Sequence, residues 1–100
     1  MAVTIDIQDD YMAAFLSGEL DHHTVRPIRE EIDRMASQCH PQELHLDFSS
    51  VTFMDSSGIG LVMGRYKLME ELGGIVRLVN LPAPIRKVMK IAGMDKLAHF

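Results

Sequence analysis

The chain has 100 residues, of which 47% are apolar and 24% are charged, and its formal net charge at pH 7 is −4. This length suits one domain with one hydrophobic core, and the acidic balance argues against direct nucleic-acid binding, which needs clustered lysine and arginine. The single Cys39 excludes an internal disulfide, and no apolar run approaches the ~20 residues of a membrane span, so we expect a cytoplasmic protein in a reducing compartment.

The first segment of the chain predicts a β-hairpin. Residues 3–7 alternate between apolar and polar side chains, which indicates a strand with one wet face. Asp9-Asp10 suits a turn, and residues 11–16 return as a second, more apolar strand. We expect Ser17-Gly18 to end this second strand.

The next segment predicts an amphipathic helix. Asp21 or Thr24 can cap its start by accepting a hydrogen bond from an unpaired backbone N–H, and Pro27 is tolerated only in a first turn. Apolar residues then recur at helical spacing up to Cys39-His40-Pro41, which ends the helix. The charged residues between them, Asp33 included, are placed on the solvent side.

A strand and a second helix follow. Residues 44–48 alternate again and predict a third strand. From residue 59 to 72 the apolar positions follow helical spacing. Gly73-Gly74 indicates the end of this helix, because glycine adopts the left-handed conformation of a C-cap without steric cost.

The last quarter of the chain completes the predicted domain. Residues 75–79 predict a fourth strand, residues 85–92 a short amphipathic helix stopped by Gly93, and residues 97–100 a last short strand. The order ββαβαβαβ predicts an α/β fold whose mixed sheet has an antiparallel first hairpin, a mostly parallel remainder and a cover of helices.

Two loops at the carboxyl ends of predicted strands are candidate sites, residues 19–24 and 54–60. Each precedes a helix N-terminus, where backbone N–H groups are unpaired and the potential is positive. Asp55, Ser56 and Ser57 can all cap the second helix, but one cap suffices. A serine hydroxyl here is therefore either a cap or a phosphoacceptor, because backbone N–H groups and the helix dipole stabilise a phosphate at this position.

Enzymatic interpretations of the same loop are weaker. A nucleophile elbow requires Gly-x-Ser-x-Gly, and no glycine stands two positions before Ser56 or Ser57. His22 and His23 have no metal-ligand partner at suitable spacing beyond Asp21, so we expect no metal site. The alternative function is a small nucleotide-binding or hydrolytic enzyme that uses Ser56 or Ser57 with His22 or His23.

Two further groups of residues receive structural interpretations. Gly60 and Gly64 are followed by no phosphate-binding signature, and their spacing predicts that the helix packs closely on the sheet. Five basic side chains of the last two predicted helices are interpreted as solvated surface: Arg65, Lys67, Arg86, Lys87 and Lys90.

Two motifs of the chain resemble the anti-sigma-factor antagonists of the STAS superfamily. They are Gly-Glu-Leu-Asp-His-His-Thr at residues 18–24 and Phe-Met-Asp-Ser-Ser-Gly-Ile-Gly at residues 53–60. The continuation at residues 64–67 and Gly73-Gly74 sharpen the resemblance to the sporulation, sigma-F branch. The likeness covers nearly all of residues 1–100 as one STAS domain, and it implies that the usual final helix is missing after Phe100.

The resemblance implies a phosphorylation-switched anti-anti-sigma factor, a binding protein and not an enzyme. The unphosphorylated form binds an anti-sigma factor that is also a serine kinase, and the sigma factor is released. Phosphorylation of the serine after the motif's aspartate, here Ser56 with Ser57 as the runner-up, abolishes binding, and a PP2C-type phosphatase reverses it. ATP and Mg²⁺ are used by the kinase, so this chain is expected to need no cofactor. The resemblance carries over these partner-binding residues: Asp21, Asp55, Ser56, Ser57, Gly58 and Ile59.

Overall fold

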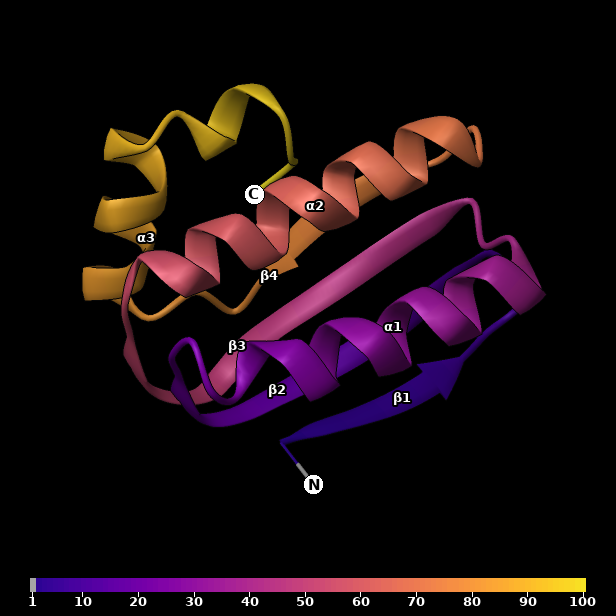
Figure 1. Ribbon diagram of the computed structural model, residues 1–100. Helices are drawn as coiled ribbons and strands as arrows, with labels where there is room; N and C mark the ends of the chain where they lie inside the picture. Colours follow the sequence, from indigo (N-terminus) through magenta and orange to yellow (C-terminus); the bar gives the residue numbers. More distant parts are fainter. Residues whose placement is uncertain (1) are drawn as a thin grey trace.

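The computed structural model describes residues 2–100, whose four strands form one mixed sheet in the order β1-β2-β3-β4 (Figure 1). β1 (Val3–Ile7) and β2 (Tyr11–Leu20) form the predicted antiparallel hairpin. β3 (Glu43–Met54) pairs in parallel with β2, and β4 (Ile75–Val79) pairs in parallel with β3. The mixed sheet predicted from the strand and helix order is therefore confirmed.

Three α-helices connect or follow the parallel strands: α1 (Val25–Cys39), α2 (Ser56–Glu71) and α3 (Ala83–Ile91). α1 and α2 lie side by side on one face of the sheet, and α3 lies beyond α2 with the short 3₁₀ helix η1 (Met94–Lys96) (Figure 1). The core fills the space between this helical layer and the sheet. Its largest fully buried side chains include Met12, Leu16, Leu20, Ile28, Ile32, Leu44, Leu46, Phe48 and Met69.

β2 is longer than the sequence predicts, because Ser17-Gly18 does not end it. The strand continues to Leu20, and the two residues cause irregularities in its pairing with β3 instead. Gly18 has a φ of 80°, a left-handed conformation that glycine accepts without strain. A β-bulge accommodates this conformation, and the parallel pairing of β2 with β3 continues after it. β3 is longer as well and runs to Met54.

The predicted last strand at residues 97–100 is wrong. Gly93, in a left-handed conformation, ends α3 as predicted, and η1 then uses the next residues. Of these residues only His99 pairs with the sheet, as an isolated parallel bridge to Arg77. The N–H of His99 donates to the carbonyl oxygen of Val76 at 2.9 Å, and its carbonyl oxygen accepts the N–H of Leu78 at 2.7 Å. Too few extended residues remain for a strand, so the observed order is ββαβαβα with η1 at the end.

The two glycines predicted to bring α2 close to the sheet do not do so. A Cβ atom added to Gly60 or Gly64 would meet no heavy atom within 4 Å, since neither glycine faces the sheet. The buried side of α2 carries Gly58, where a Cβ would overlap the side chain of Met54. Close approach therefore occurs at Gly58 and, after the helix, at Gly74.

Arg65 is not solvated as predicted but only 5% exposed. Its Nε lies 2.8 Å from Oδ1 of Asp33, which the sequence also placed on the solvent side, and its Nη2 donates to Asp33 Oδ2 at 3.3 Å. Burial raises the pKa of Asp33 and lowers that of Arg65, and each partner's charge opposes that shift. The ion pair joins α1 to α2, so losing one partner would leave a poorly solvated charge between two helices.

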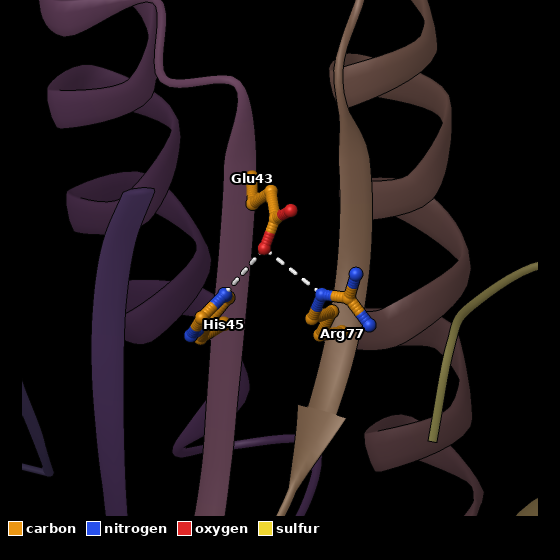
Figure 2. Close-up of polar contacts among 3 residues, drawn as sticks. All are labelled: Glu43, His45 and Arg77. Atoms are coloured by element: carbon orange, nitrogen blue, oxygen red, sulfur yellow. Dashed lines mark hydrogen bonds and ion pairs between the residues drawn. The ribbon is translucent and has the colours of Figure 1, made fainter. Parts of the chain in front are cut away.

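The sheet face opposite the helices carries polar side chains. Figure 2 shows Glu43 between His45 and Arg77, with its Oε1 2.8 Å from His45 Nε2 and 2.9 Å from Arg77 Nε. Hydrogen bonds from Arg77 and then His45 lower the pKa of Glu43. The ring of His45 stacks on Tyr11 with 4.3 Å between centroids. This network confirms the polar face that alternation in residues 44–48 predicts.

Asp47 lies on the same face, where β3 pairs with the end of β4. Its Oδ1 accepts the backbone N–H of Ser49 and its Oδ2 accepts Nδ2 of Asn80, both at 2.9 Å. Burial alone would raise the pKa of Asp47, but the hydrogen bonds from Ser49 and Asn80 outweigh it, so the pKa lies below its ordinary value. The ionised carboxylate thus holds the turn after β4 against β3.

Replacing Gly74 tests the close packing after α2. In Gly74→Ala the new Cβ would lie 2.6 Å from the carbonyl oxygen of Gln42 and 3.0 Å from that of Pro41, backbone atoms that cannot turn away. We expect a loss of about 2 kcal/mol in the free energy of unfolding, measured by urea denaturation. The control Gly60→Ala should raise stability by up to about 1 kcal/mol, because it removes a mid-helix glycine without a clash. Equal effects of the two substitutions would contradict this packing.

Asp47→Asn tests the acid dependence of stability. Because the folded pKa is lowered, the stabilisation from Asp47 is complete above the unfolded pKa of about 3.9 and is lost as the pH falls through the folded pKa. The variant should be less stable than the wild type near pH 7, and the difference should shrink below about pH 4. Urea midpoints across this range measure it, and a difference that does not change with pH would contradict the assignment.

Candidate functional site

The two candidate loops lie side by side at one edge of the sheet, as predicted. The parallel register of β2 and β3 ends with Leu20 opposite Met54, so the two loops begin side by side at the same end of the sheet. The backbone N–H of Asp55 donates to the carbonyl oxygen of Leu20 at 3.1 Å and joins the loops directly. The N-termini of α1 and α2 therefore open onto one shared surface.

The first loop is held by Asp21 and Thr24, but in a different way from the predicted helix cap. Asp21 Oδ1 accepts the backbone N–H groups of Thr24 at 3.0 Å and His23 at 2.9 Å, and these bonds, Thr24 first, lower the pKa of Asp21. The Thr24 hydroxyl accepts the N–H of Asp21 and donates to the carbonyl oxygen of Glu19 at 2.7 Å. Neither side chain accepts a bond from α1, because both close the turn before it.

Asp55 is the cap of α2. It has extended backbone angles, and its Oδ1 accepts the N–H of Ser57 at 2.8 Å. Neither Ser56 nor Ser57 uses its hydroxyl in a hydrogen bond to another of residues 2–100. Ser56 is exposed at the first position of α2, whereas Ser57 is half-buried. Of the cap candidates left open by the sequence, the structure selects Asp55 and leaves the Ser56 hydroxyl accessible.

The remaining predicted contact residues divide between surface and interior. Ile59 is half-buried beside the loop, whereas Gly58 is buried against Met54 and presents little surface to a partner. Sequence reasoning missed the outward face of α2, where exposed residues recur at helical spacing. Beyond the predicted Ser56, they are Gly60, Met63 and Lys67.

His22 and His23 remain in the first loop, with ring centroids 3.9 Å apart. In the part of the chain that the structure describes, neither imidazole is hydrogen-bonded to Ser56 or Ser57, so no nucleophile–base pair is formed. Residues 2–100 also contain no group of three or more histidine, cysteine or acidic side chains arranged around a metal site. No helix within the same residues is both long and apolar enough to cross a membrane.

An apolar groove of about 260 Å³ next to the second loop is a feature that the sequence did not reveal. It lies between the end of β3 and α3. The alternation of residues 44–48 predicted a shorter β3, so the sequence did not indicate that the strand's last residues would face α3. The groove is lined by Val51, Thr52, Phe53, Met54, Pro82, Pro84, Ile85 and Val88.

Comparison with known proteins supports the fold and the family. The STAS domain family matches residues 2–100. The chain is 35% identical over 82 residues to an anti-sigma F factor antagonist of Paenibacillus polymyxa, covering 82% of this chain and 70% of the relative. The solved structure of the anti-sigma factor antagonist SpoIIAA in its unphosphorylated form is similar, with a TM-score of 0.85, 34% identity and coverage of 97% of this chain and 85% of the other.

The phosphorylated form of the Bacillus cell fate determinant SpoIIAA is similar as well, with a TM-score of 0.78, 34% identity and coverage of 97% of this chain and 88% of the other. The strand order and the helical layer of this chain agree with the fold of these structures. The chain therefore belongs to the STAS-domain family and, within it, to the anti-sigma F factor antagonists.

Proposed function

We propose that this chain is an anti-sigma factor antagonist controlled by phosphorylation of Ser56. In its unphosphorylated form it binds an anti-sigma factor that is also a serine kinase, so that the sigma factor is released. The observation that carries the proposal is the exposed Ser56 at the first position of α2, whose hydroxyl forms no hydrogen bond with the other described residues, 2–100. Family membership and the names of the relatives support the choice of partner.

The loop geometry suits a switch that changes charge and not fold. A phosphate on Ser56 adds a charge of about −1.5 to −2 at the positive end of a helix, where backbone N–H groups stabilise it. Because Asp55 supplies the cap, the serine is not needed to hold α2 in place. A partner fitted to the neutral hydroxyl must desolvate a dianion beside Asp55 and Asp21, which costs several kcal/mol without a matched cation. Binding is then lost while the domain stays folded.

The remaining parts of the proposed cycle belong to partners. The kinase supplies ATP and Mg²⁺, and a PP2C-type phosphatase removes the phosphate. This chain acts as substrate and ligand, without a cofactor or catalytic residues of its own, and in the cytoplasm. The relative SpoIIAA has been solved in both phosphorylated and unphosphorylated forms, which supports a phosphorylation cycle in this family.

Single-serine variants test the acceptor. Incubated with a purified cognate anti-sigma kinase and Mg²⁺-ATP, the wild type should gain one phosphate, whereas Ser56→Ala should gain none. Ser57→Ala is the matched control and should be phosphorylated like the wild type, because the cap uses the backbone N–H of residue 57 and not its hydroxyl. Intact-mass and peptide mass spectrometry measure the result. A phosphate on Ser57 in the wild type would move the acceptor by one residue, contrary to the proposal.

The role of charge is tested with two nearly isosteric variants. Ser56→Asp should bind the kinase at least about tenfold more weakly than Ser56→Asn, a difference of about 1.4 kcal/mol, as measured by isothermal titration calorimetry. An acidic residue in the first turn of a helix is stabilising, so a folding defect would not explain the loss. Thermal unfolding of both variants checks this point. Equal affinities for the two variants would show that negative charge is not the switch.

A further inference from the structure

β1 is an outer strand of the sheet, and one of its two edges is unpaired. Among residues 2–100 it pairs with β2 alone (Figure 1), whereas the outer edge of β4 carries the bridge to His99. An unpaired strand edge presents backbone N–H and C=O groups to which another strand can bond. β1 contains no proline, lysine or bulge, the features that commonly prevent such pairing.

The hydrogen bonds of the hairpin show which backbone groups of β1 are turned outward. The N–H of Ser17 donates to the carbonyl oxygen of Ala2, and the N–H of Gln8 donates to that of Tyr11, both at 2.9 Å. Hydrogen-bonded positions alternate along an antiparallel pair, so the even-numbered residues of β1 bond to β2. The N–H and C=O groups of the odd-numbered residues therefore point to the free edge. These residues are Val3, Ile5 and Ile7.

The side chains of the same residues form an apolar row on the helical side of the sheet. Val3 belongs to the core, Ile5 packs against it, and Ile7 at the end of the row is 46% exposed. Beside the row, a groove of about 230 Å³ separates β1 from α1. Its lining consists of Val3, Ile5, Glu31, Arg34 and Met35. Covering this row and groove would remove apolar surface from water, which favours association.

A second copy of β1 matches this edge. Antiparallel pairing centred on Ile5 sets Val3 of one copy opposite Ile7 of the other and engages every outward N–H and C=O group of the strand. In this register Asp6 lies opposite Thr4. Centring the pair on Asp6 would set two carboxylates opposite each other, which is destabilising. Centring it on Thr4 would set Ile7 opposite residue 1, outside the strand.

The charges beside the edge also match a second copy. Glu31 and Arg34 form an ion pair on the part of α1 that lines the groove. α1 leads from the end of β2 back to the start of β3, so it runs in the same direction as β1. A two-fold axis reverses this direction in the other copy. Glu31 of each copy then lies toward Arg34 of the other, so this surface attracts its own copy.

We propose that β1 and the adjoining side of α1 form a self-association surface, where a second copy of this chain continues the sheet across a two-fold axis. The surface is small, so we expect a Kd of roughly 10–100 µM. In such a dimer the carboxyl ends of β2 point in opposite directions, and both Ser56 loops stay open. The inference does not rest on the proposed function.

Amide hydrogen exchange measured by NMR tests the edge directly. Between about 20 µM and about 1 mM protein, the amides of Val3, Ile5 and Ile7 should come to exchange several times more slowly, because dimers then outnumber monomers. The amides of Thr4 and Asp6 are the internal control and should change little, since they already bond to β2. Sedimentation velocity at the same concentrations measures the dimer. Monomers throughout, or dimers without this alternating protection, would overturn the proposal.

Charge variants of α1 test the two-fold arrangement. Glu31→Arg and Arg34→Glu each give one copy a single sign of charge beside the groove, so each variant alone should be mostly monomeric at about 1 mM. An equal mixture of the two should dimerise like the wild type, because opposite charges then meet. Glu71→Arg, a matched change at the exposed end of α2, should leave association unchanged. Circular dichroism checks folding, and a mixture that stays monomeric would contradict the arrangement.

Two further outcomes separate this surface from the site at Ser56. Ser56→Asp should self-associate like the wild type, and a dimer lost on this substitution would contradict the open position of the loops. If the chain alone stays monomeric and the β1 amides gain protection only when the anti-sigma kinase is added, the edge belongs to that partner and self-association is overturned. A chain that dimerises but gains no phosphate would contradict the proposed function and leave this inference standing.

Discussion

Parallel pairing between β2 and β3 continues past the bulge at Ser17-Gly18 until Leu20 lies opposite Met54. This register places the loops before α1 and α2 at the same edge of the sheet, and the bond from the Asp55 N–H to the Leu20 carbonyl holds them there. If β2 ended at residue 16, its hydrogen bonds to β3 would end before the first loop and would no longer fix that loop's position. The shared surface with Asp21, Asp55 and Ser56 depends on those last paired residues. The ion pair between the buried Arg65 and the partly exposed Asp33 then joins the two helices that leave this edge.

The division of roles among neighbouring side chains explains how a rigid domain can carry a switch. Asp55 caps α2, and the Asp21 carboxylate closes its own turn, so both loops are held by groups other than the serine hydroxyls. Under the proposed function, Ser56 can change its charge without removing a bond that the fold needs.

Much of this arrangement follows from local patterns, and the failures have a common origin. Alternation and helical spacing predicted the hairpin, the helices and β4, and the two motifs indicated the family. The prediction for Arg65 is wrong because the pattern of one helix does not show that a carboxylate on the neighbouring helix will pair with a cation buried between the two. Gly60 and Gly64 were misplaced because glycine spacing does not show which side of a helix meets the sheet. The segment at residues 97–100 is apolar enough for a strand, but the turn after Gly93 leaves only His99 in bridging position.

Local sequence determined where the chain is extended or helical, which residues can cap a helix, and which motifs identify the family of this chain. These properties depend on side-chain periodicity, backbone preferences and residue identity, all of which are present in a short segment. Tertiary structure alone decided that Arg65 is buried beside Asp33 and that the end of β3 meets α3 to form a groove. Each of these depends on the distance between segments far apart in the chain. That distance is set by strand register and core packing, which no single segment contains.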